Sequence, residues 1–444
     1  MKSRFPFGGS ILALAAGAML APATAAAKPD LASYVNPFAG TATARGAAQP
    51  GGTFPGATMP FGMVQFGPDT TASPEDKVAA KVGLPATGSG RGYGYRSHRI
   101  TGFSLTHLSG AGCPAYGDFP FVPLTAKLAS SPAQPGGNGL QSRYEASFSH
   151  RRESASPGAY RVRVDPPGRG SVTADLAATT RTGFARFTFP RTPHASLLVN
   201  AGGSGAGTSH AAVKLHPSRG EITGEATSGH FCAQRNQYRV YFAAHFDRRF
   251  RAFGTWKQSA LRKGSRSSAD NVPFAPRDFA QAGAYATFNA RRQRTVSARI
   301  GVSFVSVADA RRNLRAESAG HSLGALKRQA RAAWDRDLGE VRVGGAPRRE
   351  LRTFYTDLYQ AELSPRTFSD ANGRYRGMDG AVHATAGHTQ YADFSGWDTY
   401  RTQMALLAIL HPGRASDMVH SLLADAQQSG CLPKWPIADG QTME

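Results

Sequence analysis

Residues 308–338 read ADARRNLRAESAGHSLGALKRQARAAWDRDL, and here the pattern of the chain changes from that of strands to that of helices. The stretch is rich in Ala, Arg, Leu and Glu and has few helix breakers, which predicts helix. Helical spacing of apolar residues recurs in three later segments, 350–363, 400–410 and 415–428. Gly430 is placed to end the last of these helices, and 369–379 reads as a strand and turn between them.

The chain before this stretch, from about residue 34 to residue 307, consists of short β-type runs separated by Gly, Pro, Ser and Asn. Alternating or short apolar runs occur at 160–164, 196–200, 238–242 and 295–302. Repeated strand signals without helical periodicity between them indicate an antiparallel β-sandwich. A chain of 444 residues also exceeds what one core usually organises, so we expect two domains of an α+β protein.

The first 27 residues have the pattern of a secretory signal peptide. Lys2 and Arg4 precede an apolar run at 11–20, and small residues at 23–27 offer a cleavage site. The apolar run is too short to span a bilayer, which takes about twenty residues. We therefore expect a secreted or periplasmic protein without a membrane span.

The formal net charge of +22 raises the question of an anionic partner. The basic residues are mostly arginines scattered along the chain, in runs no longer than pairs, and no DNA-reading motif accompanies them. We therefore predict no nucleic-acid binding and assign the charge mainly to a solvated surface. Binding of an acidic polymer is a weaker alternative.

Three cysteines lie far apart, at Cys113, Cys232 and Cys431. An exported protein permits disulfides, but an odd count leaves at least one thiol free, and the sequence leaves the pairing open. No spacing resembles a zinc knuckle.

Loops dense in Gly, Pro and aromatic residues occupy 36–41, 51–65 and 107–119. Such loops bring backbone and rings close to a ligand, although tight turns at a sheet edge have the same composition. In the third loop, Cys113 reads equally as a small buried hydrophobe and Asp118 as a turn cap.

Trp397 opens a helix on which Asp398 and Arg401 lie three residues apart, hence on one face. One interpretation is a first-turn Asp with an i,i+3 ion pair. The other is a carboxylate that accepts hydrogen bonds from sugar hydroxyls beside a stacking indole. The pattern alone favours neither.

Six motifs together resemble glycoside hydrolase family 92, the calcium-dependent exo-acting α-mannosidases. They are NPFAGT, GGTFPGATMPFGMVQ, ITGFSLTHLSGAGCPAYGDF, SGHFC at 228–232, FSGWDTYRT and LPKWPIADGQT. The resemblance runs from about residue 32 to the end. After the signal peptide (1–27), it implies a β-sandwich (28–307), a helical linker (308–340) and the start of an (α/α)6 barrel (341–444), with the site at the junction.

The resemblance also implies an inverting mechanism, in which one carboxylic acid protonates the leaving oxygen and a carboxylate base activates water. Calcium is the expected cofactor, engaging mannose hydroxyls, and an α-mannosyl glycan is the expected substrate. Carried over by motif, the substrate-binding residues are Phe38, Cys113, Asp118, Trp397, Asp398, Arg401, Lys434 and Trp435.

Gln441 departs from the family pattern, because it stands where the family has its glutamate acid. A carboxamide cannot supply a proton, so we hypothesise a substrate whose leaving group needs none, such as a mannose-1-phosphodiester. Glu444 is an alternative acid, displaced by three residues.

The family continues for some three hundred residues beyond the length of this chain, and those residues carry its general base and most of its calcium ligands. The resemblance therefore leaves the metal ligands unknown here and implies an incomplete barrel without activity of its own. The alternative function is that of a non-catalytic, carbohydrate-binding β-sandwich.

Overall fold

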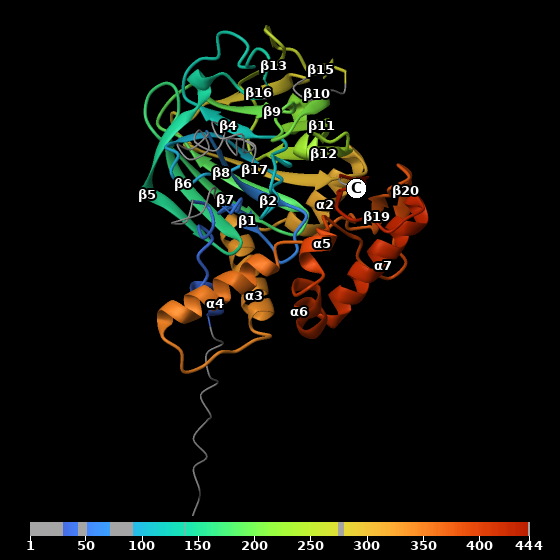
Figure 1. Ribbon diagram of the computed structural model, residues 1–444. Coiled ribbons are helices and arrows are strands. Elements are labelled where there is room, and N and C mark those ends of the chain that lie inside the picture. The colour runs from blue at the N-terminus through green and yellow to red at the C-terminus, as the bar shows by residue number, and fades with distance from the viewer. Residues whose placement is uncertain (1–29, 43–50, 72–91, 138, 274–278, 443–444) are drawn as a thin grey trace, which may run out of the picture.

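The structure is a computed structural model that describes residues 30–42, 51–71, 92–137, 139–273 and 279–442. A large antiparallel sheet system occupies the chain up to Ser303, and the helices follow it (Figure 1). This confirms the predicted order of a β-rich part and a helical part. The predicted signal peptide and Glu444 lie outside the described residues, and the domain boundaries stay predictions.

The strands pair in two antiparallel runs that join where β3 pairs with β5. The first run is β15 (Ser267–Asn271), β10 (Thr208–His216), β11 (Glu221–Gly229), β12 (Gln237–Phe246), β17 (Thr295–Ser303), β8 (Thr182–Thr188), β7 (Val172–Ala178), β6 (Ala159–Asp165) and β5 (Ala146–Ser156). The second is β14 (Ala260–Lys263), β13 (Ala252–Lys257), β16 (Ala282–Phe288), β9 (Ala195–Asn200), β4 (Phe121–Leu124), β3 (Arg99–Ser104), β2 (Gln65–Thr70) and β1 (Ala57–Thr58).

The residue pattern of each strand follows from its place in these runs. In β6, Tyr160, Val162 and Val164 are buried while the two arginines between them are exposed, as expected for a strand with one wet face. All six residues of β9 are buried, because β4 and β16 flank it and both of its faces are covered. One hydrophobic cluster takes residues from both runs, so they share a core.

Two helices connect the strands to the rest of the chain, α2 (Val307–Ser318) and α3 (Leu323–Leu338). Ser306 and Ser322 cap their N-termini by accepting a hydrogen bond from a backbone N–H three residues on. The helix α2 packs on β17 at Gly301, where a Cβ would lie 1.9 Å from the Ala310 carbonyl oxygen. Only glycine permits this approach of helix to sheet.

A second core forms around α4 (Arg348–Ala361). Trp334 of α3 is fully buried there against Tyr359, and its indole N–H donates to the Thr58 carbonyl oxygen at 2.8 Å. The N-terminal turn η1 (Leu31–Ser33) packs into the same core. The first described residues thus lie against helices from the middle of the chain.

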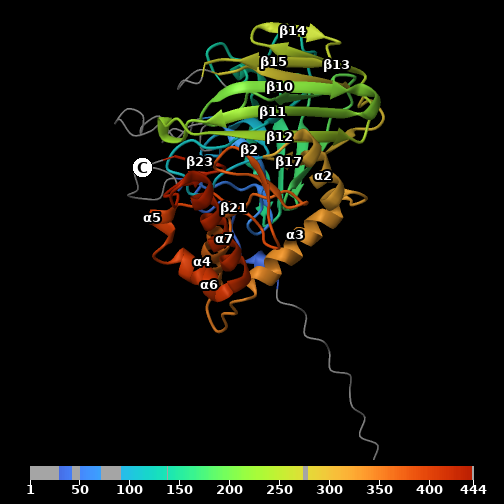
Figure 2. The ribbon, with the colours of Figure 1, turned by 90° about the vertical axis from the view of Figure 1, so that its right-hand side faces the viewer.

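The last hundred residues combine short helices and hairpins (Figure 2). They are β18 (Arg366–Thr367) with β21 (Tyr391–Ala392), β19 (Arg374–Arg376) with β20 (Val382–Ala384), α5 (Gly396–Thr399), α6 (Gln403–Leu410), α7 (Pro412–Ser429), and β22 (Pro436–Ile437) with β23 (Gly440–Gln441). The helix α7 ends at Gly430, which has φ of 81°, as the sequence predicts. Among the described helices, none has the length and apolar character needed to cross a membrane.

Candidate functional site

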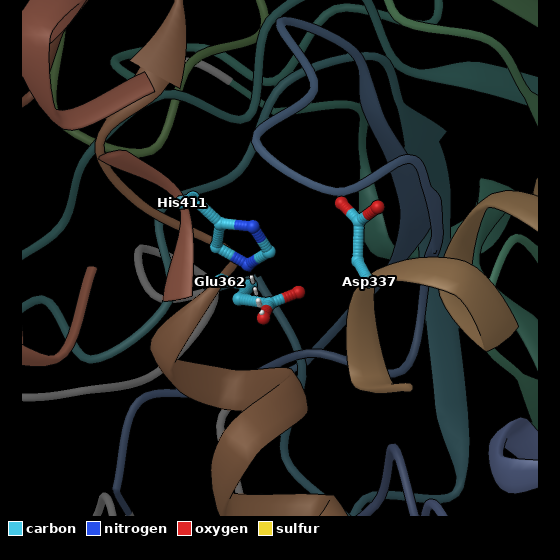
Figure 3. A group of neighbouring side chains, drawn as sticks. All are labelled: Asp337, Glu362 and His411. Atoms are coloured by element: carbon cyan, nitrogen blue, oxygen red, sulfur yellow. Dashed lines mark hydrogen bonds and ion pairs between the residues drawn. The ribbon is translucent and has the colours of Figure 1, made fainter. Parts of the chain in front are cut away.

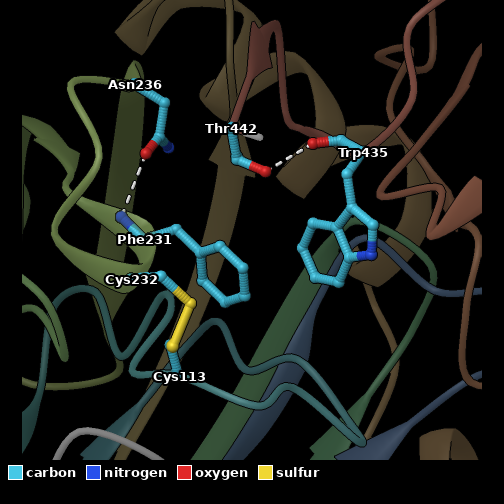
Figure 4. Close-up of a disulfide and its surroundings, with 6 residues drawn as sticks. All are labelled: Cys113, Phe231, Cys232, Asn236, Trp435 and Thr442. Atoms are coloured by element: carbon cyan, nitrogen blue, oxygen red, sulfur yellow. Dashed lines mark hydrogen bonds between the residues drawn. A yellow bond between two sulfur atoms is a disulfide. The ribbon is translucent and has the colours of Figure 1, made fainter. Parts of the chain in front are cut away.

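Trp435 lies where the C-terminal segment meets the strands. Its ring stacks on that of Phe231 with centroids 4.6 Å apart and planes 13° from parallel (Figure 4). Cys232, the next residue, forms a disulfide with Cys113 of the 107–119 loop. The structure therefore settles the pairing that the sequence leaves open, while Cys431 is an exposed free thiol.

The turn that presents Phe231 has an unusual backbone. His230, Cys232 and Ala233 have φ of 66°, 50° and 62°, in the left-handed region that few non-glycine residues adopt. The side-chain oxygen of Asn236 accepts the Phe231 N–H at 3.0 Å, and the disulfide holds the other side of the turn. Surrounding contacts thus fix the Phe231 ring against Trp435.

Gln441 lies on the same hairpin segment as Trp435. Its side-chain oxygen accepts hydrogen bonds from the backbone N–H groups of Lys434 at 3.1 Å and Trp435 at 3.4 Å. The Thr442 hydroxyl donates to the Trp435 carbonyl oxygen. Gln441 and Lys434 are both exposed, so this end of the hairpin faces solvent.

The helix α5 brings a second set of predicted residues to Trp435. The indole N–H of Trp435 points to the Asp398 carboxylate at 3.5 Å, and Ser395 also donates to that carboxylate. Trp397 is 63% exposed. Arg401 donates to the Tyr400 hydroxyl at 2.9 Å, and the described residues show no ion pair between Arg401 and Asp398, which does not favour the ion-pair interpretation of this motif.

Two other predicted residues are placed differently. Asp118 is fully buried and accepts hydrogen bonds from the hydroxyl groups of Thr106, Ser228 and Tyr238 at 2.8–3.0 Å. Burial raises its pKa, which these three donors oppose. Both carboxylate oxygens of Asp118 already accept hydrogen bonds from hydroxyl groups of the protein, so this buried side chain stabilises the 107–119 loop. It does not cap an exposed turn.

Phe38 packs in a separate aromatic cluster, against Tyr93 and Tyr95. The structure therefore links Asp398, Lys434 and Gln441 to Trp435 by hydrogen bonds, and Cys113 through the disulfide beside Phe231. Trp397 precedes Asp398 on α5, and Phe38 and Asp118 lie outside these contacts. A role for any of them in substrate binding stays a prediction.

A buried ion pair that the sequence analysis missed lies beneath the hairpin. Arg366 contacts the Asp393 carboxylate at 2.5 Å, and both side chains are almost completely buried. The other oxygen of Asp393 accepts the Tyr116 hydroxyl at 2.6 Å and the Ala438 N–H at 3.0 Å. The ion pair thus joins the 107–119 loop to the C-terminal hairpin.

A cavity of about 690 Å³ opens on the other side of the hairpin. Its lining includes Gln237, Arg239, Tyr241, Arg376 and Asp439. Burial raises the pKa of Asp439 to about 7, and burial together with the charge of Asp439 raises the pKa of Asp425 on α7 to about 7. One oxygen of Asp439 is buried and has no hydrogen-bond partner among the described residues. Asp425 on α7 thus lies close enough to the hairpin for the charge of Asp439 to act on it.

The Asp425–Asp439 pair predicts a pH dependence of stability. Between about pH 4 and pH 7 both carboxyl groups hold a proton in the folded state, whereas an unfolded aspartate, with its ordinary pKa of 3.8, has released it. The free energy of unfolding should therefore fall as the pH rises from about 4 to 7 and become constant above pH 7. We expect Asp425→Asn to match wild type near pH 4 and to exceed it above pH 7 by up to about 4 kcal/mol. Urea unfolding at several pH values measures this.

A matched control is Asp379→Asn, which changes an aspartate in an exposed ion pair with His383. It should shift the free energy of unfolding by no more than about 0.5 kcal/mol at any pH. Identical pH profiles for wild type and Asp425→Asn would contradict the assignment.

The described residues contain one cluster that could hold a metal ion, formed by Asp337, Glu362 and His411. Calcium prefers six to eight oxygen ligands. This cluster offers an imidazole nitrogen, and the Arg414 guanidinium already contacts Asp337 at 2.5 Å. The donor set therefore does not fit calcium.

Comparisons with known proteins agree along the whole described chain. Residues 34–303 match the model of the glycosyl hydrolase family 92 N-terminal domain, and residues 309–444 match that of the family 92 catalytic domain. The chain is similar to a family GH92 alpha-mannosidase from Bacteroides thetaiotaomicron, with 28% identity and a TM-score of 0.78, over 93% of this chain and 52% of that one.

Two further relatives are an inverting family GH92 mannosidase and a glycosidase. The mannosidase, from Bacteroides thetaiotaomicron VPI-5482, has 25% identity and a TM-score of 0.75 over 91% of this chain and 49% of its own. The other is an uncharacterized secreted glycosidase of Arthroderma benhamiae, 24% identical over 98% of this chain and 52% of its own. The chain thus spans about half the length of these relatives.

Proposed function

The chain belongs to glycosyl hydrolase family 92, and from this membership we propose that the protein is a glycosidase that removes terminal α-linked mannose. The similar solved structures include a family GH92 alpha-mannosidase, which is also solved in complex with mannoimidazole, and this supports a mannose-type substrate. The resemblance of this chain to an inverting mannosidase supports the same stereochemical course here.

The proposal includes an architecture and a location. The two runs of strands form a β-sandwich over 28–307, 308–340 is the helical linker, and the helices from residue 341 belong to an (α/α)6 barrel. The shared core of the two strand runs and the similarity in fold support this division. Export is supported by the signal-like residues 1–27 and by a relative that is called secreted.

The observation that carries the proposal is the contact of Asp398, from one motif, with Trp435, which shares a second motif and a hairpin with Gln441. An exposed Trp397 and the edge of Trp435 offer apolar rings of the kind that stack on sugar faces. The Asp398 carboxylate lies beside them and can accept hydrogen bonds from sugar hydroxyls. Lys434, the neighbour of Trp435, adds an exposed positive charge, and Arg401 follows Asp398 by three residues as a second exposed cation.

The class of leaving group that we propose follows from Gln441. Its amide stands at the position of the family acid and cannot transfer a proton to a departing sugar alkoxide. Hydrolysis of the anomeric C–O bond of a mannose-1-phosphodiester releases a phosphate monoester, which departs as a weak base and needs no proton. We therefore assign a mannose-1-phosphodiester as the preferred substrate, with the phosphate close to Lys434 and Arg401.

Steady-state kinetics test this assignment in a version of the protein that has the full length of its relatives. We expect kcat/KM for a mannosyl phosphodiester to exceed that for α-1,2-mannobioside by at least about 10²-fold, because acid catalysis contributes about 10² to 10⁴. A clear preference for the mannobioside would refute the phosphodiester assignment. If the protein binds sugar but hydrolyses neither compound, the proposed glycosidase activity is refuted.

Calcium remains part of the proposal only through family membership. When bound, it would engage the hydroxyl groups of the mannose ring. The Asp337, Glu362 and His411 cluster does not have the ligand set that calcium prefers, so we assign no calcium ligand among the described residues.

A further inference from the structure

Three helix ends meet at a cluster of polar side chains that are largely buried. Asp337 stands in the last turn of α3, Glu362 directly follows α4, and His411 precedes α7 (Figure 3). One potential ligand atom from each residue lies within 4.8 Å of those of the other two. The His411 Nε2 atom is 3.0 Å from one carboxylate oxygen of Glu362.

The Glu362 side chain is fully buried, yet it is incompletely satisfied. Its residue exposure is 0%, and the second carboxylate oxygen has no hydrogen-bond partner among the described residues. Burial raises the pKa of Glu362, which the neighbouring His411 opposes. A buried carboxylate oxygen without a donor is costly, by about 1–3 kcal/mol or more. The site therefore lacks one electropositive group.

The other two side chains are held in place by groups that leave ligand atoms free. Arg414 holds one oxygen of Asp337, while among the described residues the other oxygen contacts the exposed Arg336 guanidinium at 3.6 Å. The Arg414 guanidinium also lies over the Phe61 ring, whose edge contacts His411. The ring and the guanidinium thus orient the two outer ligands.

We propose that Asp337, Glu362 and His411 bind a divalent cation of borderline hardness, of which Zn²⁺ is the representative. Two carboxylate oxygens and one imidazole nitrogen are ligands that zinc accepts at about 2.0–2.2 Å, with a fourth place for water. Calcium and magnesium prefer oxygen alone. The ion supplies the missing partner of Glu362, and Arg414 becomes a hydrogen-bond partner of a ligand.

The location gives the ion a structural role that is independent of the mannosidase proposal. It connects the C-terminal end of α3, the C-terminal end of α4 and the N-terminal end of α7. These ends are 25 to 74 residues apart and pack in two different hydrophobic clusters. Binding to the folded state alone stabilises this helical part.

Zinc titration of the chelator-treated 444-residue chain tests the proposal, in a Cys431→Ser background that removes the exposed thiol. We expect one equivalent of Zn²⁺ bound with a micromolar or lower Kd by calorimetry, and a rise of about 2–5 °C in the midpoint of thermal unfolding. Glu362→Gln, which keeps the shape of the side chain, and His411→Gln should each weaken binding at least about 10²-fold. An excess of Ca²⁺ should not displace the zinc.

His383→Gln is the matched control, because His383 pairs with Asp379 at 3.0 Å on the surface without a second carboxylate. It should leave the tight site unchanged. Less than 0.2 equivalent bound at about 100 μM zinc, or binding that survives both cluster substitutions, would overturn the proposal. If those variants fail to fold, X-ray absorption spectroscopy of the zinc-loaded Cys431→Ser protein tests the proposal instead. A zinc coordination shell without an imidazole nitrogen would exclude this site.

Discussion

Replacement of Gln441 by glutamate in the full-length protein is expected to raise kcat/KM for α-1,2-mannobioside by about 10² to 10⁴. The substitution supplies the missing proton donor at the proposed acid position. Glutamate can keep the contacts of the amide oxygen with the N–H groups of Lys434 and Trp435, so the hairpin should retain its shape. Parallel assays of mannobioside hydrolysis by Gln441→Glu and wild type measure the gain.

Two features make this result specific. The N–H donors stabilise the ionised carboxylate, so the gain should be greatest at acidic pH, where the introduced carboxyl group still carries its proton. On a mannosyl phosphodiester the same variant should change kcat/KM less than tenfold, because the phosphate leaves without protonation. Equal gains on both substrates, or no gain on the mannobioside, would show that position 441 is not the acid position.

Replacement of Arg366 by methionine is expected to lower the free energy of unfolding by about 3–5 kcal/mol. The substitution leaves the Asp393 carboxylate buried with only the Tyr116 hydroxyl and the Ala438 N–H as partners. Methionine fills much of the volume, so lost charge compensation dominates the effect. Urea unfolding measures it as a lower midpoint at constant m-value.

Two variants calibrate the loss at Arg366. Arg366→Lys keeps the positive charge but gives up donors to the backbone carbonyls of residues 63 and 107, and it should fall between wild type and Arg366→Met. Arg99→Met breaks an exposed pair with Glu145 at 4.0 Å and should cost less than about 1 kcal/mol. A similar small cost for Arg366→Met would mean that water reaches Asp393.

The sequence predicts the elements of the fold well because their periods are local. The period-two pattern of β6 and the short apolar run within β9 are readable from six or seven residues each. The change to helical spacing after residue 308 is equally clear. The strand order is not readable, since it depends on pairings such as β3 with β5 and β17 with β8. Nor does any local pattern place η1 against Trp334, some three hundred residues later.

The candidate site divides in the same way. Trp397, Asp398 and Trp435 are identified through motifs, and the structure brings Asp398 to the Trp435 indole. Neither Asp393 nor Arg366 belongs to a motif that predicts a buried ion pair. In the sequence alone, a single charged residue is expected to be exposed to solvent unless its partner is known. The sequence also does not show whether the Asp118 side chain faces a ligand or is buried below the loop. Two of its three hydroxyl donors, Ser228 and Tyr238, lie on strands more than a hundred residues later in the chain, and the third is Thr106.

The Cys113–Cys232 disulfide has a mechanical consequence. It closes a covalent loop with a sequence separation of 119, which contains β4 to β11 and therefore strands of both runs. When the oxidised chain is pulled from its two ends, that loop cannot add to the extension. The fully stretched length is then shorter by about 40 nm, at 3.3–3.6 Å per residue, than that of the reduced chain. More than a quarter of the chain is thereby protected from tension, including the turn that holds Phe231 against Trp435.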